Sequence, residues 1–392
     1  MGIFGRKGSN IRVAIDASPN AIRGLVFQIA ENGDPRMLRK MIYKSPEGVD
    51  VKKIGVKLHE FVFELVKSLE QIPEKITVGV GPELGSQEIA LLALEKPEGL
   101  KLSAPKSLEI LFVGLFEQYQ KTHNGTLAYP LEVLANGYSL KKFLQDIQNK
   151  HRLSFREITK NVQNLQFRVL CLHFGEDTGA SLFDMRKSLG GMPVEFVPLS
   201  AAYGLALTKG MNITDAFCVA VGWEETTLFL IQDNVLVEIL SFPLGERHCV
   251  RTIAKNLSIS SGEAEDLKRQ SAEYGLNSGA KVAEAVTSEI EKWKEQFIEN
   301  LGIFYSKGFL PPKTFLFGVG AHLPQFADFL RTSGWIKGVS YVGQPELLLP
   351  EAQTLFGGNS FNGTLRGPEE LPLGALVFYS LKNTPLFNKS VS

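Results

Sequence analysis

The sequence predicts an α/β protein built from two similar lobes with a cleft between them. The chain has 392 residues, which is long for a single hydrophobic core. Each half begins with three segments of strand pattern and continues into helical segments and a further strand. The halves share this order of elements but not their residues. Ligands of such folds bind where strand ends and turns of both lobes converge.

The first half supplies three strands, a helix and a fourth strand. Pro19 and Asn20 favour a turn between the first two strands. The helix has apolar residues at helical spacing, from Ile54 to Leu69. The expected strands cover 11–17, 21–30, 37–43 and 74–81, and the expected helix covers 49–69.

The segment over 83–165 departs from this plan and is interpreted as a small inserted α+β subdomain. It has helical patterns over 107–121 and 154–165 and a strand-like pattern over 129–143. After it, we expect a strand over 167–174 that resumes the main sheet. A helix over 177–191 and a strand running into a small-residue helix over 194–207 complete the lobe.

The second half opens on FCVAVGWEETTLFLI, residues 217–231, which predicts two strands joined by a short turn. Ser260 precedes a helical pattern with Glu263 and Glu265 in its first turns, as an N-cap requires. The other expected elements are strands over 235–245 and 313–320 and helices over 247–259, 260–275, 279–305 and 323–335.

Composition excludes several classes of function. Lysine plus arginine equal aspartate plus glutamate at 42 each, so zero net charge does not favour broad binding to nucleic acid or anionic lipid. No apolar run approaches the roughly 20 residues that span a bilayer, and residues 1–10 lack the apolar core of a signal peptide. The three cysteines and six histidines show no metal-ligand spacing, and we expect structural roles for them. These features favour a cytoplasmic protein.

The order of motifs over residues 11–380 resembles the actin-like ATPase superfamily, in particular its FtsA/PilM branch. The resemblance implies an actin-like, ribonuclease H-like duplicated fold, with a subdomain inserted in the first lobe. It implies the following division: a flexible lead over 1–10, a first lobe over 11–82 and 166–212, an inserted subdomain over 83–165, a second lobe over 213–385 and a flexible tail over 386–392.

The first phosphate hairpin of the family reads roughly Asp-Ile-Gly, then small hydroxyl residues and a lysine. Asp16 matches the acid that holds a magnesium ion, and Arg23 matches the lysine. Ser18 stands at the glycine position, and Asn20 is at the turn. Serine there hinders the close approach of backbone N–H groups to phosphate. The metal ligand that the resemblance implies is Asp16.

The second phosphate hairpin keeps Gly222, Thr226 and Thr227 of the family pattern. Its acid is replaced by Ala220, which cannot orient a metal-bound water, and Trp223 replaces a glycine at the phosphate. Glu224 and Glu225 add negative charge beside a triphosphate.

The residues expected near the adenosine match the family pattern better than the two phosphate hairpins do. Glu265 and Lys268 match the family pair near the ribose and base, and a spacing of three places them on one helix face. Gly318, Gly320 and Ala321 match its glycine-rich adenosine loop. The segments over 198–207 and 371–380 resemble the two helices that cross between the lobes.

Simpler interpretations exist for each motif. The hairpin over 217–231 also fits an ordinary β-hairpin, Asp16 fits a turn cap, and Glu265 with Lys268 fits a surface ion pair. Only the joint order of the motifs favours the family.

The resemblance implies a cytoplasmic scaffold with a weakened ATP·Mg cleft. Its partner would be the cytoplasmic peptide of a membrane pilus protein or the tail of a tubulin-like division protein. No catalytic residue is assigned, and efficient ATP hydrolysis is not expected with Ala220 in place of the acid. Membrane association would be indirect, through partners. The alternatives are an active Mg-ATPase and a division protein that forms homo-oligomers or filaments.

Two features favour the pilus type over the division type. The chain ends in SLKNTPLFNKSVS, which lacks the apolar residues of an amphipathic membrane-targeting helix. It begins with a short IFGRKG lead, as pilus-type chains often do.

Overall fold

The computed structural model of the protein describes residues 10–45, 47–95, 105–140, 162–190, 192–274, 279–305, 308–332, 341–356 and 364–383. The expected lead before Asn10, the expected tail over 386–392 and residues 154–161 of an expected helix lie outside these ranges.

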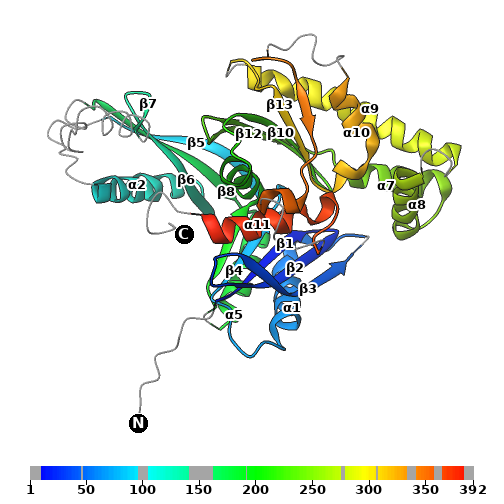
Figure 1. Cartoon of the computed structure of the whole chain (residues 1–392), viewed down its shortest axis with the longest axis horizontal. Helices are drawn as coiled ribbons and strands as arrows, with labels where there is room; N and C mark the ends of the chain where they lie inside the picture. The colour runs from blue at the N-terminus through cyan, green and yellow to red at the C-terminus, as the bar shows by residue number, and fades with distance from the viewer. Residues whose placement is uncertain are drawn as a thin grey trace.

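The first sheet lies in the N-terminal lobe (Figure 1). It consists of β1 (Ile11–Ser18), β2 (Ala21–Ile29), β3 (Pro35–Lys44), β4 (Lys75–Val80) and β9 (Val194–Pro198). The strand order is β3-β2-β1-β4-β9, with β1 antiparallel to β2 and parallel to β4. Two packed helices, α1 (Ile54–Val66) and α5 (Glu176–Ser188), share a core with these strands. Gly55 permits their contact, because a Cβ there would lie 1.9 Å from the Ser181 carbonyl oxygen.

The second sheet repeats the first strand for strand. It consists of β10 (Ala216–Val221), β11 (Thr226–Gln232), β12 (Val235–Phe242), β13 (Lys313–Phe317) and β14 (Glu346–Leu348), in the order β12-β11-β10-β13-β14. β10 is again antiparallel to its hairpin partner and parallel to the next strand. The predicted α/β fold of two similar lobes is therefore confirmed.

The described part of the second lobe includes the helices α7 (Glu246–Leu257), α8 (Ser261–Tyr274), α9 (Ala280–Tyr305) and α10 (Pro324–Arg331). The predicted N-cap of α8 is confirmed: the Ser260 backbone N–H donates to Glu263 Oε2 at 2.9 Å, and the Glu263 N–H donates back to the Ser260 hydroxyl. This reciprocal pair satisfies two backbone donors at the start of the helix.

A third sheet forms the inserted part of the chain. It consists of β5 (Ser86–Glu95), β8 (Asn164–His173), β6 (Thr126–Ala135) and β7 (Tyr138–Ser139), with α2 (Pro105–Gln120) beside it. The prediction that 167–174 resumes the main sheet is wrong, because β8 pairs antiparallel with β5 and β6. The described part of the strand-like segment, residues 129–140, is a hairpin, since Asn136 and Gly137 both have positive φ and make the turn.

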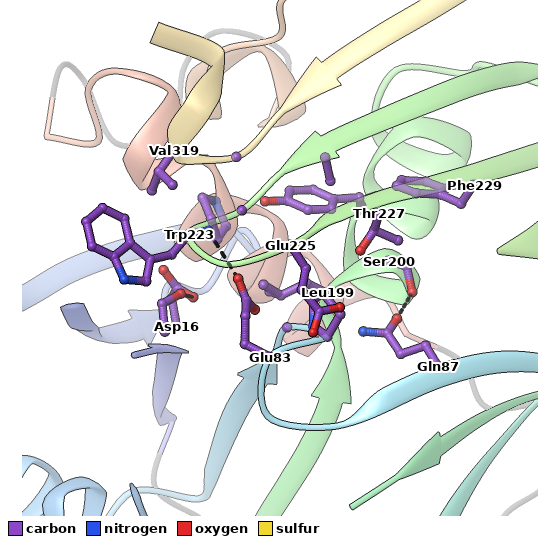
Figure 2. A pocket seen from close by; sticks show the side chains of 18 of the residues that line it. Asp16, Glu83, Gln87, Leu199, Ser200, Trp223, Glu225, Thr227, Phe229 and Val319 are labelled. Carbon is purple, nitrogen blue, oxygen red and sulfur yellow. Dashed lines mark hydrogen bonds between the residues drawn. The ribbon is translucent and has the colours of Figure 1, made fainter. Parts of the chain in front are cut away.

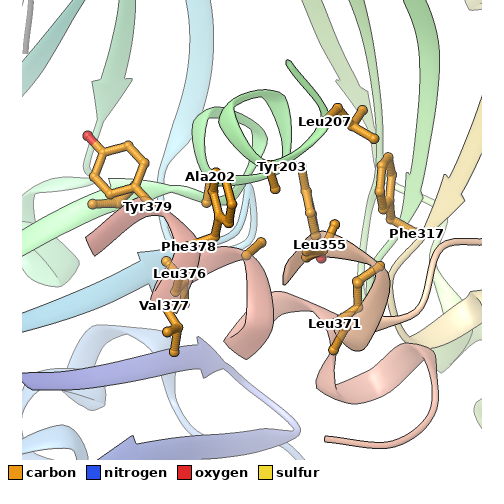
Figure 3. Packing of buried hydrophobic residues seen from close by; sticks show 14 of the residues in the cluster. Ala202, Tyr203, Leu207, Phe317, Leu355, Leu371, Leu376, Val377, Phe378 and Tyr379 are labelled. Carbon is orange, nitrogen blue, oxygen red and sulfur yellow. The ribbon is translucent and has the colours of Figure 1, made fainter. Parts of the chain in front are cut away.

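The two lobes are joined through a common core. It is built around α6 (Leu199–Leu205), a π-helical turn η2 (Ala206–Gly210), a short helix η6 (Ala352–Phe356) and α11 (Leu371–Lys382). Figure 3 shows side chains of α6 and α11 meeting there, with Phe317 of the second sheet beside them. The ring of Tyr203 stacks on that of Phe317 with centroids 4.5 Å apart. Gly374 allows α11 to approach η6, because its Cβ would lie 2.9 Å from that of Ala352.

None of the described helices is long and apolar enough to cross a bilayer.

Candidate functional site

The β1–β2 turn, the β10–β11 turn and the loop after β4 meet at a cavity between the lobes (Figure 2). The cavity measures about 50 Å³, which holds a few water molecules at about 10–15 Å³ each. The predicted site residues that line it are Asp16, Ser18, Asn20, Gly222, Trp223, Thr227 and Gly318.

Asp16 is buried and already bonded on both carboxylate oxygens. Arg23 Nη1 donates to Oδ2 at 3.1 Å, and the Ser18 hydroxyl donates to Oδ1 at 3.0 Å. Burial raises the pKa of Asp16, while Arg23 and Ser18 partly offset that rise. Three predicted site residues therefore bond one another, and a metal ion at Asp16 would compete with the Arg23 guanidinium. Asn20 lies in the adjoining turn, 8% exposed, and its Oδ1 accepts no hydrogen bond from the described residues.

The β10–β11 turn directs its backbone donors at a carboxylate of the other lobe. Glu83 Oε1 accepts from the Trp223 N–H at 3.1 Å and from the Glu224 N–H at 3.3 Å. Glycine at 222 suits this turn, because a Cβ there would lie 2.8 Å from the Glu225 carbonyl oxygen and 2.6 Å from Glu83 Oε1. Burial and the nearby Glu225 raise the pKa of Glu83 to about 7, against the backbone hydrogen bonds that lower it.

The two glutamates of this turn differ in their surroundings. Glu224 forms ion pairs with Arg247 and, at 3.7 Å, with Arg251. Arg247 Nη2 also donates to the Glu47 carbonyl oxygen at 2.8 Å, which links α7 to the first lobe. Among the described residues no cation pairs with Glu225, and burial, with the Glu224 charge, raises its pKa.

Trp223 is 1% exposed and packs beside a buried ion cluster. The Lys268 ammonium lies 5.6 Å from the centre of the indole ring, within cation–π range. Lys268, itself 1% exposed, forms an ion pair with the buried Glu246, and His322 Nε2 lies 3.0 Å from Glu246 Oε1. Burial favours the neutral acid, but Lys268 and His322 outweigh it and lower the pKa of Glu246.

The predicted Glu265–Lys268 pair is present on one face of α8, with 3.9 Å between Oε1 and Nζ. The shorter contact of Lys268 is with Glu246, which the sequence did not indicate. The alternative of a surface pair is wrong for Lys268, because its side chain is buried.

The predicted adenosine loop packs tightly on the end of β10. Gly318 has a φ of 84°, and a Cβ there would lie 2.2 Å from the Val221 carbonyl oxygen. A Cβ on Gly320 would lie 2.3 Å from Val221 Cγ1, and Ala321 is buried in the second-lobe core. Contact with Val221 accounts for both glycines.

The threonine pair splits between the core and the cavity. The Thr226 hydroxyl donates to the Leu244 carbonyl at 2.6 Å and accepts from Trp293 Nε1 at 2.8 Å, inside the second lobe. Thr227 lines the cavity, and its hydroxyl lies 3.0 Å from that of Ser241.

Sequence reasoning missed Glu83 and Glu246. Glu83 follows β4, whose carboxyl end lies beside that of β1, and this edge of a parallel pair is where α/β ligands bind. The position after that strand was the available signal. Glu246 is the first residue of α7, directly after a glycine. An acid at this position normally interacts with the helix dipole, so nothing in the sequence indicated that Glu246 would pair with Lys268.

Comparisons with solved structures show the fold of this chain: it is that of the two-lobed actin-like ATPases. The PilM structure of a PilM–PilN type IV pilus biogenesis complex matches 95% of this chain and 98% of its own, with a TM-score of 0.63 and 14% identity. The predicted resemblance to the FtsA/PilM branch is thus confirmed at the level of the fold.

Two further structures share the arrangement at lower similarity. The ethanolamine utilization protein EutJ of Carboxydothermus hydrogenoformans has a TM-score of 0.47 at 14% identity, covering 94% of this chain and 89% of its own. MreB 5 of Spiroplasma citri, solved with AMPPNP, has a TM-score of 0.45 at 10% identity, covering 95% and 96%. No family model and no curated protein matches the sequence.

Proposed function

We propose that this chain is a scaffold of the FtsA/PilM type that binds a peptide of a partner protein and whose cleft does not hold ATP. The observation that carries the proposal is the pair of hydrogen bonds from the Trp223 and Glu224 N–H groups to Glu83. Backbone N–H groups of a glycine turn bind phosphate in nucleotide sites. Here a carboxylate of the chain itself accepts them.

The residues around the cavity do not fit an ATP·Mg complex in this arrangement. Of the two acids that the family places at the metal, only Asp16 is present, since Ala220 stands in place of the other, and Asp16 is bonded to Arg23. The carboxyl groups of Glu83 and Glu225 would stand beside the phosphates, and each would repel a triphosphate when ionised. A ligand site ordinarily measures about 300–1,000 Å³, against about 50 Å³ here.

The contacts between the two lobes would keep a docking surface for the partner in one fixed arrangement. Glu83 joins the loop after β4 to the second lobe, and Arg247 joins α7 to Glu47 of the first. Both contacts are made by side chains of the protein itself. The lobes would therefore keep one relative position without ATP.

The partner that we propose is the cytoplasmic peptide of an inner-membrane pilus protein. The PilM structure is described as a PilM–PilN pilus biogenesis complex, and this chain matches PilM along 95% of its length. The protein would then work in the cytoplasm, at the inner face of the membrane through its partner. The tail of a tubulin-like division protein is the competing ligand.

Fluorescence anisotropy tests the proposal. Labelled synthetic peptides are titrated with the full chain: the N-terminal cytoplasmic segment of the pilus membrane protein of the same organism, its scrambled version and the tail of the tubulin-like division protein. We expect saturable binding of the first alone, with the same Kd with and without ATP and magnesium. Selective binding of the division tail, or affinity only with ATP, contradicts it.

Two measurements address the alternatives. Phosphate release that Asp16→Ala abolishes would establish an active Mg-ATPase, and ATP-dependent sedimentation would establish a filament. We expect neither.

A further inference from the structure

Three potential metal ligands converge on one face of the third sheet. A carboxylate oxygen of Glu88, the Cys171 sulfur and a ring nitrogen of His173 all lie within 4.8 Å of one another. Glu88 of β5 stands directly opposite Cys171 of β8, and His173 is two residues further along β8, on the same face. Within the described ranges no other group of three such residues comes together. Strand pairing assembles this cluster, so linear spacing did not reveal it.

Hydrogen bonds fix the orientation of the His173 ring. The Thr126 hydroxyl donates to the His123 carbonyl oxygen at 2.7 Å, and its oxygen lies 2.8 Å from His173 Nδ1. Because the hydroxyl proton is committed to the carbonyl, the oxygen accepts from an Nδ1–H. His173 Nε2 is then the nitrogen directed at Glu88, as in metal sites where a second partner holds the imidazole tautomer.

Glu88 is oriented in a similar way. The Tyr119 hydroxyl of α2 donates to Glu88 Oε1, and the same oxygen lies 3.1 Å from His173 Nε2. His173 Nε2 and Glu88 Oε1 are then both acceptors that face each other. This arrangement is unfavourable unless a positive charge lies between them. Glu88 is exposed and His173 is partly exposed, which leaves the cluster open to solvent on one side.

We propose that Glu88, Cys171 and His173 bind a zinc ion, with water as the fourth ligand. Thiolate, imidazole and carboxylate are all ligands that zinc accepts. Tetrahedral zinc would hold these donor atoms about 3.3–3.6 Å apart, so closure needs movements of about 1 Å from the observed spread. The Cys171 thiol loses its proton to solvent as the sulfur–zinc bond forms, which leaves the ion bound by two anions and a neutral imidazole.

Cobalt(II) is the probe that tests the site. The full chain, without a histidine tag, is titrated with Co²⁺ and followed by absorption spectroscopy. We expect one equivalent to bind, with intense tetrahedral bands and a thiolate-to-cobalt charge-transfer band, and Zn²⁺ to displace it. Cys171→Ser removes the charge-transfer band, whereas Cys249→Ser, a buried cysteine of the second lobe, leaves it unchanged.

Two further variants keep the test independent of any folding defect in Cys171→Ser. Glu88→Gln, at an exposed position, and Thr126→Val, which removes only the hydroxyl that holds His173, each weaken Co²⁺ binding at least about tenfold while the charge-transfer band stays. A bound-cobalt spectrum without that band, or equal affinity in wild type and all three variants, overturns the proposal. His173 and Glu88 are then an ion pair only.

Discussion

The Glu83 carboxylate, in the loop after β4, accepts a hydrogen bond of 3.1 Å from the backbone N–H of Trp223 in the other lobe. In an actin-like fold, this second-lobe turn is where a phosphate would accept backbone N–H bonds. The contact joins the lobes and, under the proposed function, takes the donors that a nucleotide would need. The first two predictions follow from it.

Replacing Glu83 should destabilise the protein. Glu83→Ala leaves the Trp223 and Glu224 N–H groups without their acceptor, which costs about 1–3 kcal/mol of unfolding free energy. Glu83→Gln keeps a carbonyl oxygen at the same place and should cost less than half as much. Urea denaturation of the three proteins measures this order. Equal stability of wild type and Glu83→Ala would show that the contact contributes nothing.

The stability of the wild type relative to Glu83→Gln should depend on pH. The folded-state pKa of Glu83 is raised to about 7 from a usual 4.5, so the folded protein binds this proton more tightly than the unfolded chain. The resulting stabilisation is complete below about pH 4.5 and is lost as the pH rises through about 7. Urea midpoints between about pH 5 and 8 test the sign; a difference that grows with pH contradicts it.

Lys268 should be essential for the fold of the second lobe. Lys268→Met leaves the buried Glu246 carboxylate with His322 as its remaining partner, and removing one partner of a buried ion pair costs about 3–5 kcal/mol. Adding Glu246→Gln should recover part of the loss. Lys255→Met, at an exposed position of the adjacent helix α7, is the matched control, expected within about 0.5 kcal/mol of wild type. Thermal unfolding distinguishes these variants, and equal losses in Lys268→Met and the control would refute the role.

Gly318 should tolerate no side chain. Its φ of 84° and the approach of the Val221 carbonyl make Gly318→Ala strained, by about 2 kcal/mol or more. Gly302→Ala in α9 is the control, because nothing lies within 4 Å of its added Cβ, and alanine stabilises a helix interior by about 0.5–1 kcal/mol. Opposite changes in stability are expected. Unchanged stability of Gly318→Ala would contradict the steric explanation for this glycine.

Much of the fold was predictable because it rests on local patterns. The two hairpins, the N-cap at Ser260 and the small-residue helices α6 and α11 all carry their signals within a few residues. The third sheet was harder. β8 has a strand pattern that says nothing of its neighbours, and its long pairing with β5 is a non-local choice. The segment was therefore assigned to the wrong sheet.

The site was predictable only in part, and for the same reason. Motif matching identified the turns that line the cavity, including Asp16 and Gly222. It did not indicate that Arg23 would bond Asp16 or that Glu83 would reach the opposite turn, since both depend on how lobes and side chains pack. The Glu88 cluster is likewise a product of strand register.

Isothermal titration of the full chain with ATP, with and without magnesium, tests the central claim most directly. The account predicts no saturable heat for the wild type, because Glu83 accepts from the turn donors and Asp16 is bonded to Arg23. A thermal unfolding curve of the same sample shows that the protein titrated is folded. Micromolar, magnesium-dependent binding of one ATP per chain would contradict the account.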